Sequence, residues 1–303
     1  MKRKYFCSVS LLKDNMCLQL EKPKGPFLAR QDIKLIALDL DGTLFDDQGN
    51  IPEENVKVLQ ALAENNTIIA LSSGRMTDCV APAGEIMGID CPLIVYNGAM
   101  VRARKRENRE IIYHNPLPPE YGDMLIDYSL QHRFHLNYYL NDTLYAQEDK
   151  YLRKYALIYS RQTGATFHFL KDLRKLKGNA PTKLILITDT AHEDISRTRD
   201  FQYEHFMRKL GEKINLVKTN PEYLEFLNKG ADKGIGLQKI SEFYGISREN
   251  IIAFGDGEND IEMLEFAGIG VALSNAKEKV KKIADVVLDW DNNQAGVARF
   301  LSR

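Results

Sequence analysis

The sequence is poor in cysteine, and it lacks both a long apolar segment and an excess of charge of either sign. Its four cysteines, at positions 7, 17, 79 and 91, include no Cys-x-x-Cys pair and have no histidines at zinc-ligand spacing. This scarcity argues against a disulfide scaffold or a zinc knuckle and favours reduced thiols in the cytosol. No apolar run approaches the roughly 20 residues that a membrane helix requires, so we expect no membrane span.

The charges nearly cancel, because 41 Lys and Arg side chains stand against 42 Asp and Glu side chains. A balanced chain offers no electrostatic attraction to nucleic acid or to a membrane surface, so a small molecule is the expected partner. The basic start Met1–Lys4 precedes a short apolar run, but that run holds two serines and lacks an A-x-A-like cleavage site. We therefore expect a cytoplasmic protein, and the sequence does not indicate its oligomeric state.

Strands and helices alternate near both ends of the chain, which is the pattern of a parallel sheet covered by helices. Residues 1–31 have mixed charge and no clear periodicity, so we predict an N-terminal tail without chemistry of its own. We expect helices at 232–244, at about 259–267, after Pro52 and after Arg75, and strands at 33–38, 67–71, 92–96, 251–254 and 270–273.

The middle of the chain, residues 101–227, is too long to be a loop. It contains candidate strands at 111–113, 184–187, 215–217 and 223–227, and helical stretches at about 119–132 and 191–210. We predict an α/β protein in which residues 32–100 and 228–303 form one doubly wound core. The middle would be a second α/β domain that covers the core like a lid.

Two carboxylates stand where the first strand ends, in the run Asp39-Leu40-Asp41-Gly42-Thr43. Side chains two residues apart on a strand project to the same face, and ligands of open α/β sheets bind at the carboxyl edge. Like charges so close together are tolerable mainly when a cation or a shared proton occupies the site, and Mg²⁺ is the cation that fits carboxylate oxygens best. Asp39 would be the nucleophile and a metal ligand, and Asp41 the general acid and base.

Other polar residues are predicted to reach the same edge of the sheet. Ser73-Gly74 offers a hydroxyl and an unobstructed N–H for a phosphate oxygen, although a simple N-cap serine is the plain alternative. Lys233 lies in the first turn of a helix, where a cation opposes the helix dipole unless an anion such as phosphate offsets it. A solvated surface lysine is the alternative there.

The run Gly255 to Asp260 follows another predicted strand. It is not a helix-loop-helix calcium site, because the sixth loop position would be Ile261 instead of glycine. Asp256 suits a second metal carboxylate, Asn259 could donate to phosphate, and Asp260 could hold Lys233 or a metal-bound water. Carboxylates, a lysine and a hydroxyl around one cation indicate phosphoryl transfer.

These motifs, in this order, resemble those of the haloacid dehalogenase-like phosphohydrolases, and Asp39 to Leu44 with Gly255 to Asp260 resembles their Cof-type branch. The resemblance covers about residues 33–303. It implies a Rossmann-like core, an α/β cap inserted after the third core strand, and Mg²⁺-dependent hydrolysis of small phosphomonoesters, such as sugar phosphates, through an aspartyl phosphate. Two features depart from the family pattern: Ser73 replaces a more frequent threonine, and the tail is long.

The resemblance also implies roles by motif position. Mg²⁺ would be held by Asp39, Asp256 and the backbone carbonyl of Asp41. The phosphate would be bound by the Leu40 backbone, Ser73, Gly74, Lys233 and Asn259. Arg75 and Asn97-Gly98 match the family as well and would face the substrate, with an ordinary ion pair and an ordinary turn as alternatives.

Three other functions stay open at this point. A phosphosugar mutase would return the phosphate to a sugar, and the sequence does not separate it from a phosphatase. A receiver-like signalling module also has clustered carboxylates at a strand edge. Such a module needs a long-lived phosphoaspartate, whereas an acid and base at Asp41 would promote its hydrolysis. A binding protein without catalysis is the third. In the middle domain, the residues that could contact substrate or simply pack are His132, His135, Tyr138, Tyr139 and Asp142.

Overall fold

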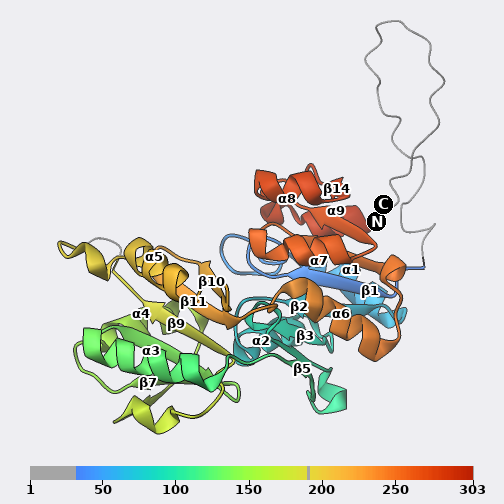
Figure 1. Ribbon diagram of the computed structural model, residues 1–303. Coiled ribbons are helices and arrows are strands. Elements are labelled where there is room, and N and C mark those ends of the chain that lie inside the picture. Colours follow the sequence, from blue (N-terminus) through green and yellow to red (C-terminus); the bar gives the residue numbers. More distant parts are fainter. Residues whose placement is uncertain (1–31, 190–191, 303) are drawn as a thin grey trace, which may run out of the picture.

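The structure is a computed structural model that describes residues 32–189 and 192–302. The predicted N-terminal tail, residues 1–31, lies outside the described residues. Figure 1 shows two groups of elements next to each other: the middle of the chain, in green and yellow, forms one, and the two ends of the chain together form the other. Strands from both ends of the chain therefore lie in one sheet.

The core contains an eight-stranded sheet with β1 (Leu35–Asp39) between β2 (Ile68–Ser72) and β12 (Ile251–Gly255). Its other strands are β3 (Leu93–Val95), β4 (Met100–Arg102), β5 (Ile111–His114), β13 (Ile269–Ala272) and β14 (Val286–Val287). The order is β14-β13-β12-β1-β2-β3-β4-β5. The pairs from β14 to β3 are parallel, and the pairs β3–β4 and β4–β5 are antiparallel.

Helices cover both faces of this sheet, as expected for a doubly wound fold. They are α1 (Glu53–Glu64), α2 (Thr77–Met87), α6 (Lys233–Tyr244), α7 (Ile261–Phe266), α8 (Glu278–Ile283) and α9 (Gly296–Leu301). Alternate residues of β1 are buried on opposite faces: Ile36 and Leu38 cluster with α1, α2 and α9, whereas Leu35 and Ala37 cluster with α6, α7 and α8. Burial of each large aliphatic side chain contributes roughly 2 kcal/mol, so β1 is firmly held.

The inserted domain, residues 117–228, contains a six-stranded sheet in the order β10-β11-β9-β6-β7-β8. Its strands are β6 (His135–Leu140), β7 (Thr143–Gln147), β8 (Phe167–Leu170), β9 (Lys183–Ile187), β10 (Ile214–Lys218) and β11 (Tyr223–Asn228). Its helices are α3 (Pro119–His132), α4 (Arg153–Thr163) and α5 (Arg199–Leu210). The side chains of α3 and α5 pack into one apolar cluster with the sheet, and Figure 1 shows both helices on the same face.

Two details of the predicted middle domain were wrong. The strand predicted at 111–113 is present as β5, but its place was wrong, because it pairs with β4 at the edge of the core sheet and lies outside the inserted domain. The helix predicted at 191–210 begins only at Arg199, because a 3₁₀ turn at Ile195–Arg197 precedes it. In addition, β6, β7, β8 and α4 had no predicted counterparts.

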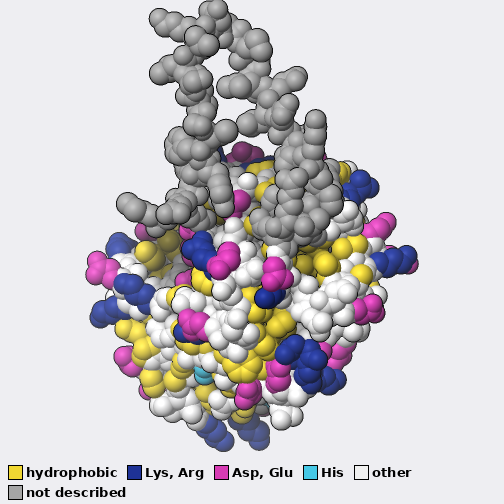
Figure 2. Space-filling view, turned by 90° about the vertical axis from the view of Figure 1, so that its right-hand side faces the viewer, with side chains coloured by type: hydrophobic (Ala, Val, Ile, Leu, Met, Phe, Trp, Pro, Cys, Tyr) yellow, Lys and Arg dark blue, Asp and Glu magenta, His cyan; other side chains and the backbone are white. Residues whose placement is uncertain are grey.

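The surface agrees with the balanced composition. On the face shown in Figure 2, Lys and Arg side chains are interspersed with Asp and Glu side chains. Among the helices of residues 32–189 and 192–302, none is both long enough and apolar enough to cross a bilayer.

Candidate active site

The carboxyl ends of four neighbouring strands bring the predicted site residues together. Asp39 is the last residue of β1, Ser73 follows β2, the turn Tyr96–Gly98 follows β3, and Asp256 follows β12. Because these strands are parallel and adjacent, their carboxyl ends lie at one edge of the sheet. Three of the four segments expected to meet at this edge, those of Asp39, Ser73 and Asp256, follow these strands, and Lys233, the fourth, begins α6.

Three carboxylates form the centre of the site. One oxygen from each of Asp39, Asp256 and Asp260 lies within 4.8 Å of the others. Asp39 and Asp260 are buried, with 6% and 1% of their surface exposed. The Asp260 Oδ2 oxygen accepts hydrogen bonds from the backbone N–H groups of Asp256 (3.0 Å) and Gly257 (2.9 Å), so it fixes the loop after β12.

Lys233 is the cation of this cluster. Its side chain is fully buried, and its Nζ lies 2.5 Å from Asp39 Oδ1 and 2.5 Å from Asp260 Oδ1. It is the first residue of α6, whose N-cap Asp232 accepts from the Ile235 N–H at 2.7 Å. The alternative of a solvated surface lysine is thus wrong, because both carboxylates hold Lys233 inside the protein.

The pKa values in the cluster are shifted by burial and by neighbouring charge. Burial and the Asp260 charge raise the pKa of Asp39 well above its usual range, although Lys233 opposes the shift. Burial and Asp260 also raise the pKa of Asp256, to about 6. Burial lowers the pKa of Lys233, but attraction to Asp260 and Asp39 outweighs burial and leaves that pKa raised. One lysine does not compensate three carboxylates, so the cluster has an excess of negative charge.

The cluster fits a hard divalent cation. Its donors are carboxylate oxygens, the type that Mg²⁺ prefers, and the raised pKa values of Asp39 and Asp256 result from burial and from repulsion by Asp260, both of which a cation would offset. Asp260 is less suited to direct binding, because Lys233 and two backbone N–H groups already occupy its oxygens. A divalent metal is therefore compatible with the residues present.

Asp41 lies apart from the carboxylate cluster. Its side chain is 56% exposed, and Arg75 binds both of its oxygens, with Nε to Oδ2 at 3.0 Å and a second guanidinium nitrogen to Oδ1 at 2.6 Å. An ion pair was the alternative to a substrate contact for Arg75, and Arg75 forms such a pair with Asp41. In this structure Arg75 orients Asp41, and the expected contact with substrate stays a prediction.

The candidate phosphate-binding residues lie against one another. The Ser73 hydroxyl accepts a hydrogen bond from the Arg75 N–H at 3.2 Å. Asn259 Nδ2 donates to Asn97 Oδ1 at 3.1 Å, and a side-chain carbon at Gly74 would lie only 2.9 Å from the same Asn97 oxygen. Because Gly74 has no side chain, Asn97 can lie directly against the backbone of this loop. The Leu40 carbonyl accepts from Phe45 N at 2.9 Å.

Three contacts at the site were not predicted. Thr43 Oγ1 donates to Asp256 Oδ1 at 2.9 Å, although Thr43 belongs to the motif that singled out Asp39. Gly42 has φ +83°, and a side-chain carbon there would lie 2.5 Å from Asp256 Oδ2. Asn275 Nδ2 donates to the Gly42 carbonyl at 2.8 Å. The position of Asn275 just beyond the end of β13 was the only signal for it.

The inserted-domain residues considered as substrate contacts have internal partners instead. The Tyr139 hydroxyl bonds to Tyr159 at 2.6 Å, and His135 bonds to Asn137 at 3.0 Å. The Tyr138 hydroxyl donates to the backbone carbonyls of Leu176 and Asn179 at 3.4 and 3.2 Å, and the His132 ring lies 4.3 Å from that of Tyr128. Asp142 contacts the core.

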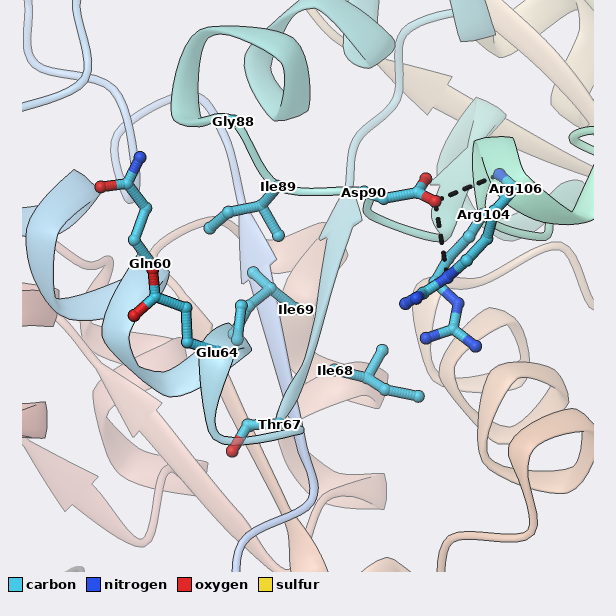
Figure 3. A pocket seen from close by; sticks show the side chains of 11 residues that line it. Gln60, Glu64, Thr67, Ile68, Ile69, Gly88, Ile89, Asp90, Arg104 and Arg106 are labelled. Atoms are coloured by element: carbon cyan, nitrogen blue, oxygen red, sulfur yellow. Dashed lines mark hydrogen bonds and ion pairs between the residues drawn. The ribbon is translucent and has the colours of Figure 1, made fainter.

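A pocket of about 380 Å³ lies at the opposite end of β2 and is lined by Thr67, Ile68 and residues around Gly88; Figure 3 shows these side chains. It lies at the amino end of that strand, whereas the carboxylate cluster lies beyond the carboxyl ends. Two of its charged lining residues, Asp90 and Arg106, are paired with each other. This pocket is therefore separate from the candidate active site.

Residues 36–301 match the model of the haloacid dehalogenase-like hydrolase family. The 5-amino-6-(5-phospho-D-ribitylamino)uracil phosphatase YitU of Bacillus subtilis is 33% identical over 269 residues, covering 88% of this chain and 96% of that protein. The pyridoxal phosphate phosphatase YbhA of Escherichia coli is 27% identical, covering 88% and 97%. The crystal structure of TM0651 from Thermotoga maritima is similar with a TM-score of 0.78 and 30% identity, covering 89% and 97%.

These matches confirm the predicted α/β fold and the predicted class of phosphoric monoester hydrolase. Because the family match extends from β1 to α9, the chain belongs to the haloacid dehalogenase-like hydrolases, in their Cof-type branch.

Proposed function

We propose that this protein is a Mg²⁺-dependent phosphatase that hydrolyses small phosphomonoesters through an aspartyl phosphate on Asp39. The observation that carries the proposal is the position of Asp39, which ends a buried strand with one oxygen held by Lys233. That contact directs a carboxylate into a site with excess negative charge, where a cation and a phosphoryl group can be bound together.

In the first step, the Asp39 carboxylate attacks phosphorus, a bond forms between its oxygen and phosphorus, and the ester P–O bond breaks. The Asp41 carboxyl gives its proton to the leaving alkoxide. Arg75 holds both oxygens of Asp41, so one of these bonds must open during proton transfer. Lys233, Ser73, Asn259 and the loop backbone would stabilise the charge on the phosphoryl oxygens.

In the second step, Asp41 takes a proton from water, and the water oxygen attacks phosphorus. The bond between phosphorus and Asp39 breaks, which releases inorganic phosphate and restores the Asp39 carboxylate. Asp39, Asp256 and the Asp41 carbonyl would hold Mg²⁺, which when bound neutralises phosphoryl charge. Asp260 would act by holding Lys233 and the loop that carries Asp256.

The inserted domain is proposed as the cap that selects the substrate. YitU and YbhA, the two relatives named above, are phosphatases of a ribitylaminouracil phosphate and of pyridoxal phosphate. We therefore propose a small phosphorylated metabolite, such as a sugar phosphate or one of these two compounds, as substrate. A cytoplasmic location is proposed as well, because Cys79 and Cys91 are free thiols of the kind that a reducing compartment maintains. Cell fractionation tests the location.

The experiment is phosphate release from sugar phosphates, nucleotides, pyridoxal phosphate and para-nitrophenyl phosphate, with Mg²⁺ or with EDTA. Wild type is compared with Asp39→Asn and with Asp127→Asn, a control at an exposed carboxylate in the inserted domain. We expect Mg²⁺-dependent release from wild type and from the control, and none from Asp39→Asn. Full activity of Asp39→Asn contradicts the nucleophile. Stable phosphorylation of Asp39 without release would favour a mutase or a signalling module.

A further inference from the structure

A charged cluster joins the inserted domain to the core beside the candidate phosphate site. Asp142 lies in the two-residue turn between β6 and β7 and accepts hydrogen bonds from three core groups. These are the Tyr96 hydroxyl at 2.7 Å, Arg102 Nε at 2.8 Å and the Thr77 N–H at 3.4 Å. The side chains of Arg102 and Asp142 are only 17% and 14% exposed, so water screens this ion pair little.

The core partner Tyr96 has an unusual backbone. Tyr96 and Asn97 both have φ +53°, the left-handed region, which is a rare conformation for a bulky aromatic residue. Such a conformation persists only when surrounding contacts hold it. Tyr96 is fully buried, and its hydroxyl is anchored by Asp142, a residue of the other domain. The hydrogen bond from Tyr96 to Asp142, a residue of the inserted domain, therefore helps to stabilise this turn.

The Tyr96–Asn97 turn is bonded directly to the loop after β2. Asn97 N–H donates to the Ser73 carbonyl at 3.1 Å, and Tyr96 N–H donates to the Arg75 carbonyl at 3.0 Å. In a trans peptide the C=O and N–H groups point in opposite directions. Holding the Ser73 carbonyl against Asn97 therefore turns the Gly74 N–H to the opposite side, as binding of a phosphate oxygen requires.

The inserted domain makes a second contact with the same loop. Lys183 Nζ, at the start of β9, donates to the Gly74 carbonyl at 2.9 Å and lies 5.9 Å from the centre of the Tyr96 ring. Its side chain is 3% exposed and is paired with Glu225. Three consecutive carbonyls of the loop are thus bonded either to the Tyr96–Asn97 turn or to the inserted domain.

We infer that Asp142 is a positioning residue for phosphate binding: by anchoring the Tyr96 hydroxyl, it holds the left-handed Tyr96–Asn97 turn and so orients the peptide groups around Gly74. The contact of the inserted domain with the core is then coupled to the orientation of the peptide groups that bind phosphate. The inference rests on the proposed phosphatase function, because it assigns the Gly74 loop to the phosphate.

The test measures binding of inorganic phosphate by calorimetry in the presence of Mg²⁺, together with kcat and KM on para-nitrophenyl phosphate. Tyr96→Phe removes the hydroxyl and keeps the ring, and Asp142→Asn weakens the acceptor. The matched control is Tyr155→Phe, because Tyr155 donates to Asp189 at 2.6 Å and Arg197 donates to the same carboxylate at 2.9 Å. That second Tyr–Asp–Arg cluster lies within the inserted domain and does not touch the core loop.

We expect Tyr96→Phe to weaken phosphate binding roughly tenfold, the effect of losing one hydrogen bond to a charged group, and to raise KM. Tyr155→Phe should bind phosphate as wild type does, although it loses the same type of bond. The variant with both Tyr96→Phe and Asp142→Asn should be weakened much less than the product of the single effects, because both changes cut one connection.

Equal phosphate affinity in Tyr96→Phe and wild type overturns the inference, and so does an equal loss in Tyr96→Phe and Tyr155→Phe, which would indicate general destabilisation. Failure of the proposed function is recognised separately, because wild type itself would then neither hydrolyse the esters nor bind phosphate. That result removes both proposals.

Discussion

Lys233 carries two electrostatic costs at once, since it lies in the first turn of α6 and has no exposed surface. A cation at a helix start opposes the dipole, and burial removes its hydration. Asp39 and Asp260, each 2.5 Å away, offset both costs. Removing only the lysine would leave two carboxylates buried side by side.

Lys233→Met should therefore lower the free energy of unfolding by about 3 kcal/mol and phosphatase activity by at least about 100-fold. Urea unfolding and phosphate release measure the two effects. Adding Asp39→Asn to Lys233→Met should restore part of the stability, because one of the unpaired charges is then gone. Strictly additive losses in the double variant would contradict the electrostatic explanation.

His135 is a second buried titratable residue, remote from the carboxylate cluster and facing Tyr155 and Phe167. Burial lowers its pKa from 6.5 to about 4, although the hydrogen bond with Asn137 opposes the shift. Between these two values the unfolded chain binds more protons than the folded chain. Stability contributed by neutral His135 is therefore lost as the pH falls from about 6.5 towards 4.

Replacement of His135 by Gln should reduce the pH-dependent change in the free energy of unfolding by up to about 3 kcal/mol. This amount is the free-energy equivalent of the shift in the His135 pKa. The measurement is the free energy of unfolding of wild type and His135→Gln at pH 7.5 and pH 4.5. His168→Gln, at an exposed histidine of β8, is the control. If the control flattens the profile equally, His135 is not the group responsible.

Single residues also explain how far the sequence could predict the site. Asp39, Ser73, Asp256 and Lys233 were identifiable, because polar groups at strand ends and helix starts have few purely structural explanations. The role of Arg75 was open to two interpretations, a substrate contact or an ion pair, and its partner Asp41 was not predicted. Such a pairing depends on the distance between two loops, which local sequence does not encode.

At the scale of elements, apolar periodicity predicted the core strands well, whereas the strands of the inserted domain were partly missed. β6 contains the buried polar residues His135 and Asn137, which interrupt an apolar run and bond to each other, through His135 Nε2 and Asn137 Oδ1, only once the chain is folded. Asn141 and Asp142, both with positive φ, form the turn of that hairpin. For β5, the local pattern predicted a strand, but only pairing with β4 determines its sheet.

The strands β9 and β11 are joined by a buried ion pair between Lys183 and Glu225 at 3.2 Å. Glu225→Gln should lower the free energy of unfolding by about 3 kcal/mol, because Lys183 would remain buried without its counter-charge. Urea unfolding followed by far-UV circular dichroism measures the loss. Glu242→Gln, in an exposed pair with Lys239 on α6, should change stability little. A loss as large in Glu242→Gln would contradict the importance of burial.

At the scale of the whole molecule, the two ends of the chain close one core, and the inserted domain leaves and returns between β5 and α6. The two connections are held together, since Asn228 Nδ2 donates to Asn115 Oδ1 at 2.6 Å and to the Pro116 carbonyl at 2.8 Å. Sequence alone predicted the insertion from its length. The docking of the inserted domain through Asp142 was not predictable, since its partners lie 40 to 65 residues away along the chain.

The proposed metal site predicts that global stability depends on Mg²⁺. Without metal, Asp39, Asp256 and Asp260 repel one another, so Asp256→Asn should be at least as stable as wild type. With Mg²⁺ at about 100 times its Kd, wild type should gain about 2.7 kcal/mol and overtake the variant. Thermal unfolding of both proteins in EDTA and in Mg²⁺ measures this reversal. If Mg²⁺ stabilises wild type and Asp256→Asn equally, the bound ion does not depend on the Asp256 carboxylate. Asp39 and Asp260 would then be sufficient to hold it.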